Sequence, residues 1–355
     1  MHVLHVVGAR PNFMKAAPVL RQLKSAGVNQ TLVHTGQHYD PAMSDVFFEQ
    51  LAMPQPDLNL AVGSGSHARQ TADIMTRFEA VIVEKRPDWV LVYGDVNSTV
   101  AAALVCAKLR VRVGHVEAGL RSHDREMPEE INRLLTDQLS DLLFTPSPDA
   151  DQNLRREGID PARIRLVGNV MIDTLMHLWP LAEAQPTNGI PNRYALVTLH
   201  RPSNVDDLPW LRSLLFALSD IGRELPVVFP VHPRTRSRIE HLTLNLNRDG
   251  LRLLEPKPYL EFLALQKRAA VIITDSGGIQ EEATFLNVPC LTVRENTERP
   301  ITVDLGTNQL VGRDIEALSA AVRQVLAGRR KIANPIPLWD GKAAARIADS
   351  LCFHS

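Results

Sequence analysis

Short runs of apolar, often β-branched residues alternate along the chain with longer stretches whose apolar residues recur at helical spacing. This alternation predicts a parallel sheet in which helices return the chain from one strand to the next. The predicted strands are 3–7, 31–34, 89–93, 111–116, 142–145, 194–199, 226–231, 251–254, 270–274 and 289–293. The predicted helices are 12–25, 43–52, 67–85, 98–109, 128–140, 148–157, 207–223, 234–246, 258–268, 278–286 and 313–328.

The alternation stops at residues 180–193, where PLAEAQPTNGIPNR is rich in Pro, Gly, Asn and Gln. Such a composition predicts a linker between two α/β domains. Each half begins with a strand and continues in βα units, so we expect two Rossmann-like domains whose parallel sheets face one another across a ligand-binding cleft. We expect domains at 1–173 and 174–340, with a C-terminal helix in 341–355 that packs back on the first domain.

Composition narrows the choice of partners. The 355 residues carry 39 basic and 40 acidic side chains, so the chain lacks the basic surface typical of proteins that bind nucleic acid or an anionic membrane. Three distant cysteines, Cys106, Cys290 and Cys352, follow neither a disulfide framework nor a zinc spacing. No apolar run approaches membrane-spanning length, and the first residues lack a signal-peptide pattern. We therefore expect a cytoplasmic protein that binds phosphate only through local groups.

Ionisable residues and glycines follow almost every predicted strand. A purely structural sheet needs turn residues at these positions, but not so many charged ones, and ligands of parallel sheets bind at this edge. The residues are Gly8, Arg10 and Lys15 after 3–7, Gly94 and Asp95 after 89–93, Glu117 and Arg121 after 111–116, His200 and Arg201 after 194–199, His232 after 226–231, and Asp275, Ser276, Gly277 and Gly278 after 270–274.

The last of these sets belongs to the stretch TDSGGIQEEA, residues 274–283, in which a strand gives way to a helix. Backbone N–H groups at a helix N-terminus and the positive end of the helix dipole attract anions. Gly277 and Gly278 therefore predict a phosphate seat. Glu282 lies one helical turn, about 5.4 Å of rise, beyond Gly278, so its carboxylate need not lie next to the phosphate and repel it.

The same residues also have structural explanations. Asp95 could cap a helix, and Glu117 could pair with Arg121. Glu129 could stabilise a helix N-terminus by its favourable interaction with the helix dipole. Arg10 and Lys15 could be solvated helix charges.

His200 could be an ordinary buried histidine. Considered alone, the residues support a two-domain α/β enzyme that acts on a phosphorylated or nucleotide-linked ligand with acid/base groups.

Seven segments, in order and at compatible spacing, together resemble the non-hydrolysing UDP-N-acetylglucosamine 2-epimerases. The resemblance runs from residue 3 to the closing DGKAAARI at 340–347 and implies the GT-B architecture of two Rossmann-like domains. The segments are GARPNFMKAAPV (8–19), GDVNST (94–99), GHVEAGLRS (114–122), PEEINR (128–133), VTLHRPSNVD (197–206), TDSGGIQEEA (274–283) and TERP (297–300).

The resemblance implies reversible conversion of UDP-N-acetylglucosamine to UDP-N-acetylmannosamine, without a cofactor or metal, by a homodimer. The C2 proton is poorly acidic, so in the family's route UDP leaves C1 as that proton is lost, and UDP then adds back to a 2-acetamidoglucal with protonation on the opposite face. Such a route needs carboxylates near the sugar and cations around the diphosphate.

Matched to the family's motifs, the implied site falls into two groups, whose roles on the two faces of C2 are left open. The implied catalytic residues are Asp95, Glu117, Glu129 and His200, the last on the diphosphate. The implied UDP-binding residues are Arg10, Lys15, His232 and Arg299, Phe262 with the backbone near Lys257 at uracil, Ser276, Gly277 and Gly278 on the phosphates, and Glu282 on the ribose.

Two departures from many bacterial relatives stand out: HRPSNVD at 200–206 replaces HRxEN, and GQHYDPAM at 36–43 replaces QHREML. The corresponding regions help some relatives bind an activating second substrate, so we expect weak or absent activation here. The departures also leave room for UDP-2,3-diacetamido-glucuronate as substrate. A hydrolysing 2-epimerase, a GT-B glycosyltransferase and a non-catalytic nucleotide-sugar sensor are the remaining alternatives, although a transferase would not need all three carboxylates and a sensor would not need Asp95 or Glu117.

Overall fold

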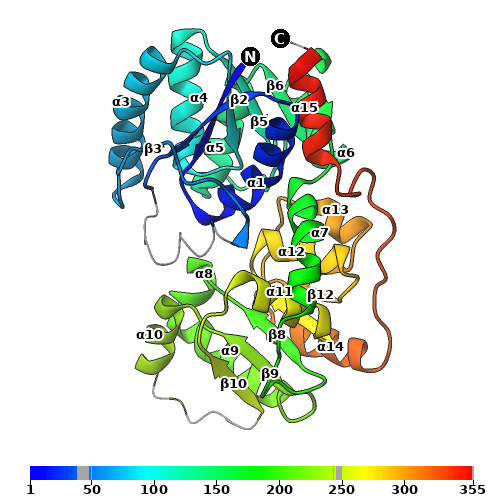
Figure 1. The fold of residues 1–355 in the computed structure, drawn as a ribbon. Helices are drawn as coiled ribbons and strands as arrows, with labels where there is room; N and C mark the ends of the chain where they lie inside the picture. The colour runs from blue at the N-terminus through cyan, green and yellow to red at the C-terminus, as the bar shows by residue number, and fades with distance from the viewer. Residues whose placement is uncertain (38–47, 49, 243, 245–249, 354–355) are drawn as a thin grey trace. The chain divides into compact units, whose positions relative to one another are not determined.

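The computed structural model describes residues 1–37, 48, 50–242, 244 and 250–353, and its internal contacts divide the chain into two compact units (Figure 1). Unit 1 consists of Met1–His177 with Pro337–Ser355, and unit 2 consists of Leu178–Ile336. The domain boundaries expected from the sequence, 173/174 and 340/341, stay predictions. Among the described residues, no helix combines the length and apolar character needed to cross a membrane.

Unit 1 contains a seven-stranded parallel sheet in the order β3-β2-β1-β4-β5-β6-β7. β4 has the sequence WVLVY and is buried at all five positions, as a strand covered by helices on both faces requires. The strands are β1 His2–Val7, β2 Asn29–His34, β3 Leu58–Asn59, β4 Trp89–Tyr93, β5 Arg112–Val116, β6 Leu142–Thr145 and β7 Ile164–Leu166.

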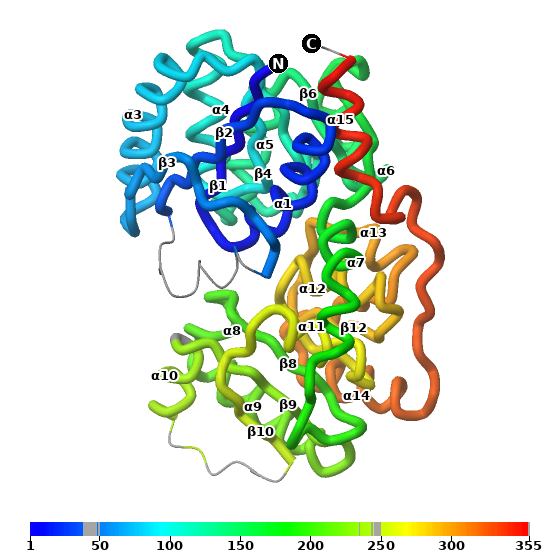
Figure 2. The backbone as a smooth tube through the Cα atoms, in the orientation of Figure 1, coloured from blue at the N-terminus to red at the C-terminus, as the bar shows by residue number. Residues whose placement is uncertain are grey.

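The helices of unit 1 form a layer on each face of this sheet. α3, α4 and α5 lie side by side, whereas α1 lies beside the C-terminal helix α15 (Figures 1 and 2). Right-handed crossovers explain the two layers, because the chain winds from β1 in one direction and from β4 in the other. The helices are α1 Arg10–Ser25, α3 His67–Lys85, α4 Asn97–Leu109, α5 Pro128–Leu139, α6 Pro148–Arg156, the 3₁₀ helix η1 Pro161–Arg163, α7 Val170–Glu183, which continues into unit 2, and α15 Ala343–Phe353.

The C-terminal segment is an integral part of unit 1. The Trp339 indole N–H donates to the Pro146 carbonyl at 3.0 Å. The Asp173 carboxylate accepts the backbone N–H groups of Ala343 at 3.2 Å and Ala344 at 2.8 Å, which fixes the start of α15. Backbone N–H groups at a helix start have no partner inside the helix, so this carboxylate stabilises the helix end.

Unit 2 contains a six-stranded parallel sheet in the order β10-β9-β8-β11-β12-β13. Its strands are β8 Ala195–Thr198, β9 Val227–Pro230, β10 Leu251–Leu254, β11 Val271–Thr274, β12 Cys290–Thr292 and β13 Asn308–Leu310. Its helices are α8 Pro202–Val205, α9 Leu208–Ile221, α10 Pro233–His241, α11 Tyr259–Arg268, α12 Gly277–Phe285, α13 Pro300–Asp304 and α14 Ile315–Leu326.

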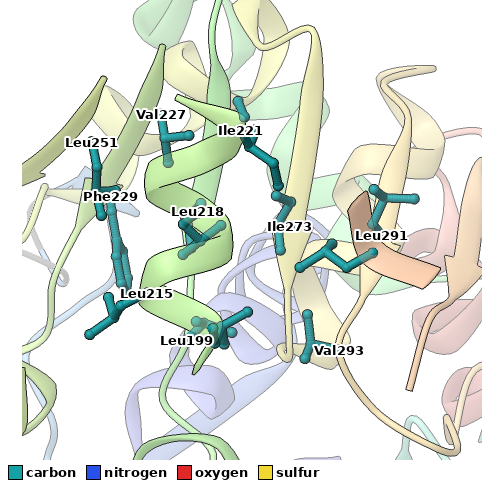
Figure 3. Packing of buried hydrophobic residues seen from close by; sticks show 14 of the residues in the cluster. Leu199, Leu215, Leu218, Ile221, Val227, Phe229, Leu251, Ile273, Leu291 and Val293 are labelled. Atoms are coloured by element: carbon teal, nitrogen blue, oxygen red, sulfur yellow. The ribbon is translucent and has the colours of Figure 1, made fainter. Parts of the chain in front are cut away.

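The core of unit 2 lies between α9 and the sheet. Figure 3 shows Leu215 and Leu218 of α9 beside Phe229 of β9 on one side and Ile273 of β11 on the other, all of them buried. Fully burying one such side chain stabilises the fold by about 1.5–3 kcal/mol. This packing holds the strand ends that carry the candidate site.

Each sheet reverses its strand order once. In unit 1 the reversal falls between β1 and β4, and in unit 2 it falls between β8 and β11. At such a switch point the two loops leave the sheet in opposite directions and open a crevice at the carboxyl ends of the strands. The residues singled out after strands 3–7, 89–93, 194–199 and 270–274 therefore fall at the two switch points.

Several predicted elements need correction. The described residues contain three further short strands (β3, β7 and β13), the short helices η1, α8 and α13, and the longer helix α7, which the sequence pattern did not predict. Residues 180–183, assigned to a structureless linker, are helical because α7 continues through Pro180 to Glu183. The predicted helix at 43–52 and the segment GQHYDPAM at 36–43 lie largely outside the described residues.

Candidate active site

The loop after β1 is tied to the end of β4 by Asn12. Its side-chain oxygen accepts the N–H groups of Gly8 at 3.1 Å and Ala9 at 3.0 Å, while its amide nitrogen donates to the Tyr93 carbonyl at 2.7 Å. Gly8 is required by space, because a Cβ there would lie 2.1 Å from the Ser98 hydroxyl oxygen. Asn12 therefore joins the two loops that meet at the switch point of unit 1.

Lys15 and Glu117 form a buried ion pair at this switch point. The Lys15 ammonium lies 2.5 Å from the Glu117 carboxylate, and the two side chains are 6% and 3% exposed. Glu117 has a left-handed backbone, with φ of +73°, which is costly for a residue other than glycine. Gly94 packs against the pair, since a Cβ there would lie 2.7 Å from the Lys15 ammonium. Lys15 is therefore not a solvated helix charge.

Asp95 is held by Arg133 of α5. One guanidinium nitrogen of Arg133 lies 2.5 Å from the Asp95 carboxylate, and another lies 2.8 Å from Glu130. Burial by itself would raise the pKa of Glu130, but hydrogen bonds from the Ser122 and His123 backbone and the charge of Arg133 outweigh it and lower that pKa. Asp95 is thus an ion-paired carboxylate and not the cap of α4, whose N-cap residue is Val96.

Glu129 and Arg10 are more accessible than these pairs. Glu129 lies in the first turn of α5 and is half-buried, directly before Glu130. Arg10 is the first residue of α1 and is exposed. Both therefore lie near the switch point with side chains that solvent reaches.

Arg121 does not pair with Glu117, which removes that structural explanation for the carboxylate. Its guanidinium instead donates to Glu157 through two nitrogens, each at 2.7 Å, and lies 2.7 Å from Asp137. Burial by itself would lower the pKa of Arg121, but these carboxylates raise it above its ordinary value.

The switch point of unit 2 is organised by Asp275, the residue that follows β11. Its fully buried carboxylate accepts the backbone N–H groups of His200 at 3.1 Å and Arg201 at 2.9 Å, and the Asn204 amide at 3.1 Å. Burial by itself would raise the pKa of Asp275, but the His200 ring and these donors lower it. The His200 ring nitrogen Nδ1 lies 3.1 Å from Asp275, while its side chain stays 48% exposed.

α12 begins directly after Asp275, with Ser276 as its N-cap residue and Gly277 as its first residue. A Cβ on Gly277 would lie 2.3 Å from the Arg299 guanidinium and 2.5 Å from the Glu298 carboxylate. Arg299 is itself 2.9 Å from Glu281 and 2.6 Å from Glu298. The predicted phosphate seat is therefore a helix N-terminus that packs tightly on a buried arginine–glutamate cluster.

The remaining predicted nucleotide residues lie elsewhere in unit 2. Glu282 is 2% exposed and accepts hydrogen bonds from the Tyr259 hydroxyl at 2.8 Å and the Gln266 amide at 2.5 Å. Lys257 pairs with Glu261 at 3.0 Å.

Phe262 of α11 is half-buried and His232, which follows β9, is exposed. The structure thus assembles Arg10, Lys15, Asp95, Glu117 and Glu129 within unit 1, and the other predicted site residues within unit 2. Their roles stay predictions.

Sequence reasoning assigned no positioning role to the residues that hold the site residues in place, above all Arg133, Asp137 and Asp275. Asp275 was visible as the residue after a buried strand, and Arg133 stands three residues after Glu130, a spacing that places both on one helix face. Nothing local distinguishes Asp137, whose importance comes from partners on β5 and the loop after it.

Two doubly wound parallel sheets, with paired carboxylates at one switch point and a helix N-terminus with a histidine at the other, define a two-domain protein of GT-B-like fold. The model of the UDP-N-acetylglucosamine 2-epimerase family matches residues 21–352. The chain belongs to that family.

Individual relatives are similar over nearly their whole length. A crystal structure of the Methanocaldococcus jannaschii UDP-GlcNAc 2-epimerase, in complex with UDP-GlcNAc and UDP, is 42% identical, with a TM-score of 0.92 and coverage of 99% of this chain and 100% of that one. A UDP-N-acetylglucosamine 2-epimerase of Methanococcus maripaludis is 43% identical over 97% of this chain and 96% of its own. The UDP-2,3-diacetamido-2,3-dideoxy-D-glucuronate 2-epimerase of Pseudomonas aeruginosa is 42% identical over 99% of both chains. These similarities confirm the predicted family, fold class, epimerase function and isomerase class.

Proposed function

We propose that this chain catalyses the reversible inversion of C2 in UDP-N-acetylglucosamine, which gives UDP-N-acetylmannosamine. The observation that carries the proposal is the chemistry of the two switch points. Unit 1 presents carboxylates beside buried cations, as proton exchange at a sugar carbon requires. Unit 2 presents a helix N-terminus and a histidine, as a diphosphate requires.

In the proposed reaction the C1–O bond to UDP breaks as the C2 proton is lost to a carboxylate, which leaves a 2-acetamidoglucal and bound UDP. UDP then adds back to C1, and a proton returns to C2 from the opposite face. We assign the proton exchange to Asp95, Glu117 and Glu129. Lys15 supports this assignment, because its ammonium lies 2.5 Å from Glu117 and holds that carboxylate at the switch point.

We assign the leaving diphosphate to His200 and to the start of α12, Ser276–Gly278, with Arg10 as a further cation. Support comes from Asp275, which holds the His200 and Arg201 backbone and leaves the His200 ring half-exposed. With the His200 ring held in this way, it and the N–H groups at the start of α12 would stabilise the charge that develops on departing UDP without reorganising.

We assign the nucleoside to Glu282, Phe262, the backbone near Lys257, Arg299 and His232. Glu282 already accepts hydrogen bonds from Tyr259 and Gln266. These two neighbours would orient the carboxylate for contact with the ribose hydroxyls.

A second candidate substrate is UDP-2,3-diacetamido-glucuronate, which the 42% identity to the P. aeruginosa enzyme favours. Incubation of each sugar nucleotide in deuterated water decides between them. We expect deuterium at C2 of both epimers of UDP-N-acetylglucosamine, with UDP retained. Label only in the diacetamido sugar would show that this sugar nucleotide is the substrate. Release of free N-acetylmannosamine would show that the chain is a hydrolysing 2-epimerase. No label in either sugar would refute the proposed epimerase activity.

Two further proposals concern the assembly of the chain and its location in the cell. We propose a homodimer on the family resemblance, which light scattering of the purified chain tests. We propose a cytoplasmic location on the cysteine pattern, in which Cys106 and Cys290 are buried free thiols and Cys352 is exposed.

A further inference from the structure

His115 is a fully buried histidine of β5, two residues before Glu117, and its ring has a polar partner on each side. Its Nε2 lies 2.8 Å from the Gly94 carbonyl oxygen. Its Nδ1 lies 2.6 Å from the Asp137 carboxylate, which projects from α5. The ring therefore joins the exit of β4 to the helix layer of unit 1.

The two partners determine the protonation state of the ring. A carbonyl oxygen can only accept, so Nε2 must carry a hydrogen. Asp137 also accepts from the Gly119 N–H at 3.1 Å and lies 2.7 Å from an Arg121 nitrogen, both through its second oxygen, and such donors favour the ionised carboxylate. Burial by itself would raise the pKa of Asp137, but His115 and Arg121 lower it. An ionised Asp137 can only accept, so Nδ1 must carry a hydrogen as well.

The charges around the ring are balanced, so the positive charge of a buried imidazolium is compensated by neighbouring carboxylates. Asp137 of α5 and Glu157, next to α6, supply two negative charges, while His115 and Arg121 supply two positive ones. A buried ion is tolerated when its partners complete its hydrogen bonds, and breaking such a set by removing one member is strongly destabilising.

The location of this cluster matters because both neighbouring loops have unusual backbones. Gly94 has φ of +62° and directly precedes Asp95, and Glu117 has φ of +73°. The Gly94 N–H donates to Val116 at 3.0 Å, so the two loops are also joined by the backbone. Glycine adopts such a φ without strain, but Glu117 does not, and its conformation persists only where surrounding contacts over-determine it.

We propose that His115 is a positioning residue of the C2 epimerisation. Its ring carries hydrogen on both nitrogens, and Asp137 holds it against the Gly94 carbonyl, which fixes Asp95 relative to Glu117. The positioning role rests on the proposed function. The charge state does not, because it follows from the hydrogen bonds alone.

Nitrogen-15 NMR of the full chain with labelled histidine tests the charge state. His5 is the internal reference, because it is also fully buried in the same sheet, hydrogen-bonds the Tyr93 hydroxyl at 2.7 Å, and has its pKa lowered by burial to about 3. At pH 8 we expect His115 to show two protonated ring nitrogens and His5 to show a neutral ring, with signals assigned from His115→Gln and His5→Gln. A neutral His115 at pH 8 would overturn the proposal.

Kinetics of the same variants test the positioning role. We expect His115→Gln and Asp137→Asn to lower kcat by about 10²-fold, the size of effect that a 1 Å misplacement produces. KM and the Kd of UDP should change less than about threefold, and C2 deuterium incorporation should fall with kcat. His5→Gln should lower Tm and keep kcat. A kcat within about threefold of wild type in folded His115→Gln and Asp137→Asn, or an equal loss in His5→Gln, would refute the role. Absence of C2 exchange in wild type would instead refute the proposed function and the role with it, while the NMR result would still decide the charge state.

Discussion

After β4 and β5 of unit 1 the chain presents carboxylates that buried cations hold, whereas after β8 and β11 of unit 2 it presents a half-exposed histidine and the N-terminus of α12. The sheets are wound alike, and both sets of groups lie where the strand order reverses. The difference indicates that topology selects the place of a site while the residues after each strand select its chemistry. A carboxylate beside a cation suits proton exchange, and a fixed set of N–H donors suits an anion that stays bound.

The largest expected effect separates the two switch points directly. Glu117→Gln or Asp95→Asn should lower kcat by roughly 10²-fold or more, a common general acid–base contribution, and leave the Kd of UDP within about threefold. Steady-state kinetics and calorimetric UDP titration measure the two quantities. Asp141→Asn is the matched control and should keep kcat, because Asp141 is an exposed carboxylate that binds the Val113 N–H at the opposite end of β5. Weaker UDP binding at unchanged kcat would reverse the assignment of the two units.

Asp275→Asn should show how strongly the loop after β8, which carries His200 and Arg201, depends on the Asp275 carboxylate. The variant replaces a charged acceptor of several hydrogen bonds, each worth about 1.5–3 kcal/mol, so we expect a loss of about that size in the free energy of unfolding at pH 7, with weaker UDP binding. Denaturant unfolding as a function of pH measures it.

The pH dependence of that loss follows from the lowered pKa of Asp275. A carboxyl whose pKa is lower in the folded state adds stability above its unfolded pKa, about 3.9, and loses it as the pH falls through the folded value. The gap between wild type and Asp275→Asn should therefore shrink below about pH 4. A gap that is constant or grows on acidification would contradict this account, and Asp220→Asn, on an exposed pair with Arg223 at 3.4 Å, should open no such gap.

Gly277→Ala tests whether the helix start in unit 2 must approach its neighbours so closely. The new methyl group would lie 2.3 Å from the Arg299 guanidinium, so we expect a destabilisation of about 1–3 kcal/mol from overpacking. Displacement of the helix start should also weaken UDP binding by roughly tenfold, which corresponds to about 1.4 kcal/mol. Gly65→Ala, where no atom lies within 4 Å of the added Cβ, should change neither property. Unchanged UDP affinity in Gly277→Ala would remove the helix start from the nucleotide site.

Lys257→Met should have the smallest effect. The Lys257–Glu261 pair is about one-third exposed, and pairs of this kind contribute less than about 1 kcal/mol. Only the backbone near Lys257 is assigned to uracil, so the Kd of UDP should stay within about twofold. A loss of fivefold or more in UDP affinity, with normal stability, would place the side chain itself on the nucleotide.

The longer elements were predictable because their patterns are set locally. β1 and β4 are buried on both faces and therefore appear as continuous apolar runs. β3, β7 and β13 have only two or three residues, too few for a periodic signal, and they exist because neighbouring strands pair with them. α7 was missed because its apolar residues are not confined to one stripe and Pro180 lies inside it.

The site was predictable only in part for a related reason. Asp95, Glu117 and His200 follow buried strands, so the sequence alone places them at a sheet edge. Their partners come from distant segments, since Arg133 is 38 residues from Asp95 and Asp275 is 74 residues from Arg201. Only the tertiary fold brings such pairs together, and no local pattern encodes them.

The return of the C-terminal segment to unit 1 has a consequence for synthesis on the ribosome. Trp339 and the start of α15 bind Pro146 and Asp173, residues translated before any part of unit 2. Domains generally fold in the order in which they are translated. Here unit 1 is translated first but receives its last helix only after all of unit 2 has been translated. About half the chain is therefore synthesised between Asp173 and the helix start that its carboxylate caps.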